Sequence, residues 1–275
     1  MRRVTPAQLL GTWRVWSCSL EVHLTPCIVS CPPGDGSDVL VNPANERLEG
    51  TTFTPGECAR QFGPRTTVLY PTQVVDGLVH GARGGDSSAD DSVGAEGMAA
   101  ACAELPELDE EGTRCRTGDT VVTRAHGELL QSYRHVVHAV APFFGDRHWK
   151  RLLTSCFTQA LHQADLQKAK TVALPLLGAG ARGAPPAQAV AVAVAAVGEW
   201  GDRRSPQLDL RPLCVRFVVQ DDEVANAMTE HCDASFRRIS AYPSSVETAR
   251  RALTLTAFSS ETEGLPGDPP SQTEG

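Results

Sequence analysis

Residues 170–186, with the sequence KTVALPLLGAGARGAPP, join an apolar run to a loop of small residues and then to two prolines. The run 171–177 is short and bounded by glycine, which favours a buried strand over a helix. Residues 178–184 form the loop, and Pro185 and Pro186 suit the first turn of a helix. A strand that leads through such a loop into a helix can direct backbone N–H groups at an anion. The same pattern occurs in α/β proteins that bind no phosphate, so this stretch alone leaves both interpretations open.

Composition and charge exclude several classes of protein. The chain has 275 residues, 41% of them hydrophobic, which suits one large domain or two small ones with a substantial core. A net charge of −8 argues against a nucleic-acid-binding surface spread over the whole protein. Nine cysteines without a short repeated spacing do not resemble a disulfide framework, and no stretch has the apolar length of a signal peptide or a membrane span. We therefore expect an intracellular protein, cytoplasmic or nuclear, without a membrane partner and without direct contact to nucleic acid.

Hydrophobic periodicity predicts strands that alternate with helices. Strands are expected at residues 16–24, 38–41, 120–123, 135–140, 171–177 and 213–219. Helices are expected to start at Asp76 as the N-cap, at Met98, at Trp149, at Ala187 and near Asp221, with a further helix over residues 244–258. This alternation predicts an α/β layered fold, in which ligands usually bind beyond the carboxyl ends of the strands.

Segments rich in small, polar or acidic residues interrupt this pattern. Residues 51–73 are expected to form a long surface excursion, and the acidic residues 84–97 a mobile loop. We expect one domain over residues 1–238 with insertions at about 51–73 and 84–97. A C-terminal extension with a helix is expected over 239–258, followed by a disordered tail over 259–275.

Four segments occur in an order that is typical of one family. They are residues 39–45 (VLVNPAN), residues 74–80 (VVDGLVH), the pair 115–123 (CRTGDTVVT) and 135–142 (HVVHAVAP), and the loop 178–185 (GAGARGAP). Together they resemble a macrodomain, the module that binds ADP-ribose, over about residues 16–237. The segment VVDGLVH is most similar to the branch of the family that hydrolyses ADP-ribosyl linkages.

The resemblance implies a three-layer α/β/α fold with a central mixed sheet, an ADP-ribose cleft across its top, and no cofactor or metal ion. The ligand would be ADP-ribose or an ADP-ribosylated protein or metabolite. Catalysis is implied for Asp76, which would activate water, and for Asn45, which would contact the ribose nearest the scissile bond. The residues implied to bind the ligand are Asn42, Asn45, Val75, Gly77, Gly178, Ala179, Gly180, Ala181, Arg182 and Gly183.

The chain departs from the family pattern at both ends of the expected cleft. The excursion 51–73 replaces a short glycine run, and Arg182 stands where the family often has an aromatic residue beside the diphosphate loop. Thr25 stands where macrodomains commonly have an aspartate that recognises the amino group of adenine. No aromatic residue lies near Gln220 to stack on that base. An aromatic ring to stack on adenine could instead come from Phe53, Phe62 or Tyr70 in the excursion 51–73.

Simpler roles stay open for the main candidates. Asn45 could brace a turn after a strand, Asp76 could only cap the following helix, and His80 could be a packing residue. His135 and His138 lie three apart on one strand, face opposite sides and cannot share a metal ion. Three functions therefore remain: hydrolysis of mono-ADP-ribosyl esters, non-catalytic binding of ADP-ribose, and a different α/β enzyme whose loop holds another phosphate ligand.

Overall fold

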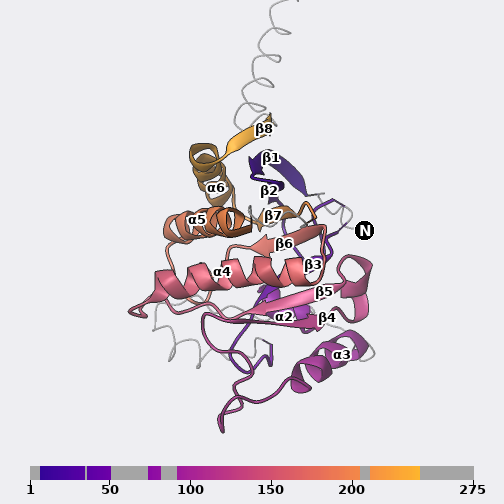
Figure 1. The fold of residues 1–275 in the computed structure, drawn as a ribbon. Helices are drawn as coiled ribbons and strands as arrows, with labels where there is room; N and C mark the ends of the chain where they lie inside the picture. Colours follow the sequence, from indigo (N-terminus) through magenta and orange to yellow (C-terminus); the bar gives the residue numbers. More distant parts are fainter. Residues whose placement is uncertain (1–6, 35, 51–73, 82–91, 205–210, 242–275) are drawn as a thin grey trace, which may run out of the picture. The chain divides into compact units, whose positions relative to one another are not determined.

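The computed structural model describes residues 7–34, 36–50, 74–81, 92–204 and 211–241 (Figure 1). Its strands are β1 (Gln8–Val15), β2 (Cys18–Leu24), β3 (Val39–Pro43), β4 (Thr120–Arg124), β5 (His135–Ala139), β6 (Thr171–Pro175), β7 (Cys214–Val219) and β8 (Arg237–Ala241). Its helices are α2 (Val75–Val79), α3 (Ser92–Ala103), the 3-10 helix η2 (Gly127–Gln131), α4 (Trp149–Leu166), α5 (Pro186–Arg204) and α6 (Asp222–Ser235). No helix in these ranges is both long enough and apolar enough to span a bilayer.

All eight strands of the described ranges form one sheet, in the order β4-β5-β3-β6-β7-β2-β1-β8. The five central strands from β5 to β2 run parallel. The outer strands β4, β1 and β8 pair antiparallel to their neighbours. The predicted mixed sheet is therefore confirmed.

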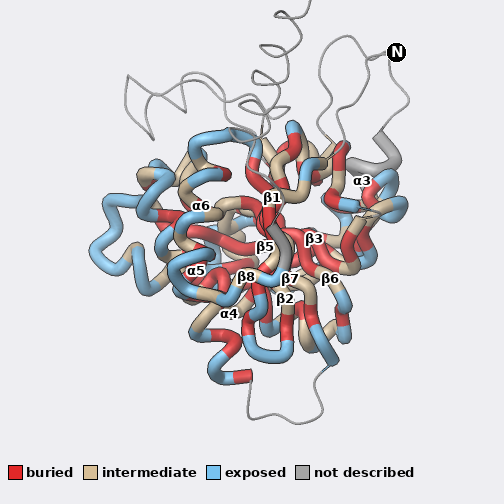
Figure 2. The backbone as a smooth tube through the Cα atoms, turned by 90° about the horizontal axis from the view of Figure 1, so that it is seen from above, coloured by how far each residue is buried: buried red, intermediate tan, exposed pale blue. Residues whose placement is uncertain are grey.

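Helices cover both faces of the sheet, which confirms the predicted three layers (Figures 1 and 2). Successive side chains of a strand point to opposite faces. In β3, Val39 and Val41 join the core beneath α4, α5 and α6, whereas Leu40 joins the core beneath α2 and α3. All three residues are fully buried, because helices close the sheet on both sides.

The two longest helices follow from their sequences in different ways. α4 is amphipathic, with one buried stripe formed by Leu153, Cys156, Phe157, Ala160, Leu161 and Ala164. In α5 nearly every residue of the first half is Ala or Val, so its periodicity could also suit a strand. The prolines at its beginning and the length of the segment favour a helix, and this helix begins at Pro186. The prediction of a buried helix here is confirmed.

The N-terminal strand prediction was wrong at its start. Residues 16–24 read as one alternating strand, but Trp16 lies in the turn between β1 and β2, with a φ of 54°. β1 itself was missed. Its register shifts between Leu9 and Gly11, and such a bulge breaks the alternation that marks a strand.

The structure also differs from the expected loop at residues 84–97. Helix α3 begins at Ser92 rather than Met98, because its first turns consist of small residues that give no apolar stripe. β8 extends past the expected domain end at residue 238, to Ala241. The excursion 51–73, the C-terminal helix predicted over 244–258 and the tail lie outside the described residues.

Asp221 caps α6, and its removal should cost a predictable amount of stability. Its carboxylate accepts hydrogen bonds from the N–H groups of Glu223 at 2.9 Å and Val224 at 3.0 Å. We expect Asp221→Ala to lower the free energy of unfolding by about 1 kcal/mol, the usual cost of losing an N-cap. Asp222→Ala, which removes an exposed carboxylate one position later, is the matched control in chemical denaturation. Equal losses in the two variants would show that the cap contributes nothing specific.

Candidate functional site

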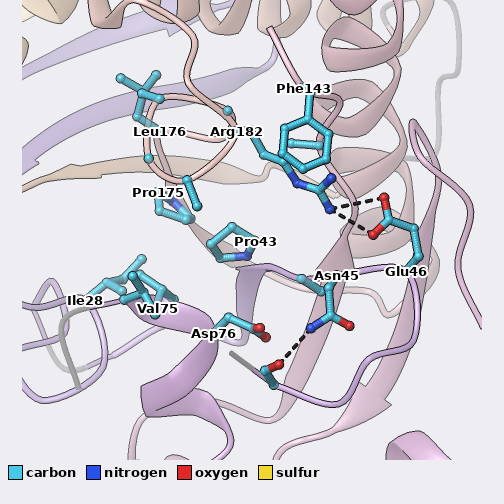
Figure 3. Close-up of a pocket in the computed structure, with 18 of the residues that line it drawn as sticks. Ile28, Pro43, Asn45, Glu46, Val75, Asp76, Phe143, Pro175, Leu176 and Arg182 are labelled. Atoms are coloured by element: carbon cyan, nitrogen blue, oxygen red, sulfur yellow. Dashed lines mark hydrogen bonds and ion pairs between the residues drawn. The ribbon is translucent and has the colours of Figure 1, made fainter. Parts of the chain in front are cut away.

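A cavity of about 700 Å³ opens at the carboxyl edge of the parallel strands (Figure 3). Every segment that leaves this edge contributes to its lining: Ile28 after β2, residues 43–47, 49 and 50 at the end of β3, Ala141 and Phe143 after β5, residues 175, 176 and 178–182 after β6, and residues 218–221 at the end of β7. The starts of α2 and α5 complete the wall with Val75, Asp76 and Pro186. This is the place where open α/β sheets usually bind ligands.

The loop after β6 forms one wall of the cavity. Gly178 has a φ of 83°, in the left-handed region that favours glycine. The N–H of Ala184 donates to the Gly178 carbonyl at 3.0 Å, and the N–H of Gly183 donates to the Gly180 carbonyl at 2.9 Å. These bonds close the loop on itself directly before α5 begins at Pro186, so the positive end of a 19-residue helix faces the cavity edge.

Asp76 lies on the opposite wall, held by a buried network. It is 3% exposed and lies inside α2, whose N-cap position is Val74. The expectation that Asp76 caps this helix was therefore wrong. The Asn42 amide Nδ2 lies 2.8 Å from Asp76 Oδ1, and the His80 Nδ1 lies 3.3 Å from the same oxygen. Two neighbours thus fix the direction of this carboxylate.

The two histidines of the network differ in charge. Burial lowers the pKa of His80, but the hydrogen bond and the charge of Asp76 outweigh it and raise that pKa from 6.5 to about 10. Burial lowers the pKa of His138 to about 4. His138 is therefore neutral at pH 7, and its Nδ1 lies 3.2 Å from the Asn42 amide. An imidazolium at His80 faces Asp76, and a neutral ring at His138 supports Asn42.

Asn45 lies between these walls and braces its own turn. Its Nδ2 donates to the Gly50 carbonyl at 2.7 Å. Its Oδ1 accepts from the backbone N–H groups of Arg47 at 3.2 Å and Glu49 at 3.3 Å. Asn45 also lines the cavity, so the turn-bracing role and a place at the site occur together.

Arg182 lies at the Asn45 end of the cavity and contacts two neighbours that sequence reasoning missed. Its Nη2 lies 3.2 Å and 3.0 Å from the two carboxylate oxygens of Glu46. Its guanidinium carbon lies 4.3 Å from the centre of the Phe143 ring (Figure 3). Glu46 directly follows Asn45, and Phe143 directly follows the motif that ends at residue 142. Both positions could have been considered from the motifs.

The structure brings most of the expected site residues to one cavity. Those that line it are Asn45, Val75, Asp76, Gly178, Ala179, Gly180, Ala181 and Arg182. Asn42, Gly77 and Gly183 do not line it. Asn42 is fully buried behind Asp76, and Gly77 is buried within α2. The loop 178–182 and the turn at Asn45, which are far apart in the sequence, therefore face the same cavity.

The far end of the cavity is more apolar. Ile28, Val218, Val219 and Val224 line it, together with Gln220 and Asp221. Thr25 does not take part, because its hydroxyl donates to the Cys31 carbonyl at 3.0 Å and the residue is buried. The candidate adenine-stacking residues Phe53, Phe62 and Tyr70 lie outside the described residues.

Comparison with known proteins agrees with this architecture. The sequence profile of the family described as Macro domain matches residues 80–193. A macro domain-containing protein of Caldanaerobacter subterraneus subsp. tengcongensis is 32% identical over 169 residues, which span 58% of this chain and 91% of the relative. The chain belongs to the macro domain family.

Further relatives of this macro domain include a named enzyme. The O-acetyl-ADP-ribose deacetylase of Salmonella typhimurium is 31% identical over 153 residues, which span 55% of this chain and 73% of that protein. Among solved structures, the Oceanobacillus iheyensis macrodomain with ADP superposes with a TM-score of 0.60 at 17% identity, covering 84% of this chain and 97% of the other. At that identity the superposition shows the shared fold alone.

Proposed function

We propose that this macro domain binds ADP-ribose in the cavity and hydrolyses mono-ADP-ribosyl ester linkages. One observation carries the proposal: the oriented carboxylate of Asp76 shares a cavity with Asn45 and with the loop 178–182. The deacetylase name of the Salmonella relative supports an ester as the substrate, and the ADP in the Oceanobacillus structure supports a nucleoside diphosphate ligand.

The backbone of residues 178–181 would bind the diphosphate. These small residues allow the backbone to approach phosphate oxygens, and N–H groups that bind an anion form charge-assisted hydrogen bonds. α5 carries no acidic residue in its first turn, so nothing there opposes a negative ligand. The backbone at Val75, on the opposite wall, would complete the clamp.

Asp76 would assist a water molecule at the terminal ribose. The water oxygen bonds to the anomeric carbon while the bond from that carbon to the acyl oxygen breaks. The electron pair of the broken bond leaves with the acyl group as a carboxylate, and a water proton passes to Asp76. Such a positioned base typically accelerates a reaction by about 10²–10⁴-fold. Asn42 and His80 would act through Asp76 by holding its carboxylate in place.

A non-catalytic reader is the second candidate, and one observation favours it. The Asn45 amide is committed to the Gly50 carbonyl and to two N–H groups of its own turn. The amide atoms of Asn45 would have to bond a ribose in addition to these three partners. A reader would bind ADP-ribose as tightly but would release none from a modified protein.

Two glycines offer a matched test of where the diphosphate binds. At Gly180 and Gly145 an added Cβ meets no atom within 4 Å, and neither has a positive φ. Only Gly180 lines the cavity. We expect Gly180→Glu to weaken ADP-ribose binding at least about tenfold, because a carboxylate would face the phosphates, whereas Gly145→Glu should bind like the native protein.

Isothermal titration with ADP-ribose, together with the ligand-induced shift of the melting temperature, measures this difference. Both variants gain the same charge, so a general electrostatic effect would weaken them equally. Equal affinities in the two variants would place the diphosphate elsewhere. No binding by the native protein at millimolar ADP-ribose would contradict the hydrolase and the reader together.

A further inference from the structure

Arg182 has hydrogen-bonding capacity that its protein contacts leave unused. Within the described part of the chain its guanidinium bonds only through Nη2, which serves both oxygens of Glu46. Nε and Nη1 have no acceptor there. Neither nitrogen is among the fully enclosed, unpartnered atoms of the described residues, which are His23 Nδ1, Asn42 Oδ1 and Thr120 Oγ1. Two donors of a side chain that is 14% exposed are thus accessible beside the cavity that it lines.

Two residues hold the guanidinium in place, and two further contacts hold Glu46. The Phe143 ring covers one of its faces at 4.3 Å, and Glu46 binds one corner. The Thr117 hydroxyl donates to Glu46 Oε1 at 2.9 Å, and the backbone carbonyl of Glu46 accepts from the N–H of Arg114 at 2.8 Å. Burial raises the pKa of the Glu46 carboxyl, but Arg182 outweighs it and holds that pKa below its ordinary value. An arginine fixed in this way loses little conformational entropy when a ligand binds.

We propose that Arg182, positioned by Glu46 and Phe143, forms a subsite for the acyl group that is linked to the terminal ribose. The subsite rests on the proposed function, and it adds to that function a choice among linkages. One of the two free donors, on Nε or on Nη1, donates to an oxygen atom of the acyl group, which is an ester oxygen in the substrate and a carboxylate oxygen in the product. Cδ lies between Nε and Nη1, so their N–H groups point to different edges of the planar guanidinium, and one of them at a time can face the acyl group.

The position of Arg182 favours the acyl group over the diphosphate. Figure 3 shows its guanidinium above Asn45, whereas Leu176 and Ile28 lie toward the opposite side of the view. The Arg182–Glu46 pair carries no net charge, so it offers directed donors without the excess positive charge that would draw in a phosphate. The carboxylate charge develops on the leaving acyl group during hydrolysis, and donors that face this charge stabilise the transition state.

The same geometry disfavours a linkage to a guanidine group. A guanidine-linked substrate presents N–H donors to the N–H donors of Arg182 and brings a second cation toward the first. Such a mismatch leaves polar groups without partners and lowers affinity. The subsite therefore predicts a preference for ester-linked over arginine-linked ADP-ribose, and it assigns that preference to one residue.

Binding measurements in the Asp76→Asn background separate recognition from turnover. The probes are free ADP-ribose and two peptides of otherwise identical sequence, one modified on glutamate through an ester and one modified on arginine. We expect the ester-linked peptide to bind about tenfold more tightly than the arginine-linked one, roughly the effect of one good hydrogen bond. Arg182→Met should abolish this preference while changing the Kd of free ADP-ribose less than about threefold.

The double variant Glu46→Gln with Arg182→Met controls for the unpaired Glu46 charge, and it should also show no preference. A preference that persists in both variants would overturn the subsite. An equal loss for free ADP-ribose and for both peptides would also overturn it, because Arg182 would then bind the diphosphate. Failure of free ADP-ribose to bind the Asp76→Asn protein with native Arg182 would instead contradict the proposed function, and the subsite with it.

Discussion

Asp76→Asn is expected to lower the rate of ADP-ribose release from an ester-linked protein by about 100- to 10,000-fold, the typical loss when a positioned general base is removed. The asparagine keeps an oxygen for the Asn42 amide, which lies 2.8 Å from Asp76 Oδ1. The shape of the cavity wall is therefore preserved, and the Kd of ADP-ribose should change less than about threefold. Single-turnover release and isothermal titration measure the two quantities on the same preparation.

A second carboxylate serves as the control for this result. Asp222 is exposed in the first turn of α6 and does not line the cavity. Asp222→Asn removes the same charge and should release ADP-ribose at the native rate. If Asp76→Asn also releases it at the native rate, Asp76 has only a structural role. If the native protein releases none, the reader candidate replaces the hydrolase.

The sequence predicted the centre of the fold better than its edges. The parallel strands β3, β6 and β7 are short, and each contains a run of three buried apolar residues: residues 39–41, 172–174 and 217–219. β1 and β8 lie at the antiparallel edge, where bulges and exposed residues remove that signal. The first turns of α3 were missed for a similar reason, because the small residues at its start give no apolar stripe.

The candidate site shows the same division between local pattern and tertiary contact. The loop 178–184 and the turn at Asn45 could be predicted because glycine and asparagine are the residue types that such local backbone conformations favour. The buried network around Asp76 could not be assigned, because Asn42 lies on β3 and His138, which contacts Asn42, lies on β5, so the two meet only after these strands pair. The Glu46–Arg182 pair joins residues 136 positions apart in the chain, and no spacing rule anticipates it.

His80→Gln is expected to lower the free energy of unfolding by about 3–5 kcal/mol at pH 6, the usual cost of removing one partner of a buried ion pair. The His80 and Asp76 side chains are 8% and 5% exposed, so water cannot replace the lost imidazolium. The glutamine keeps a hydrogen-bond donor but no charge. His148→Gln, at an exposed position without a side-chain cap bond, is the matched control and should change little.

The size of this loss should depend on pH in one direction. The pKa of His80 is raised from 6.5 to about 10 in the folded protein. A raised pKa means that the ion pair contributes its full stability below pH 6.5. This contribution then falls by about 1.4 kcal/mol per pH unit until the pH reaches the folded pKa. Chemical denaturation of both proteins at pH 6, 8 and 9.5 should therefore show the native advantage shrinking as the pH rises. An advantage that stays constant or grows would mean that His80 is neutral and forms no ion pair with Asp76.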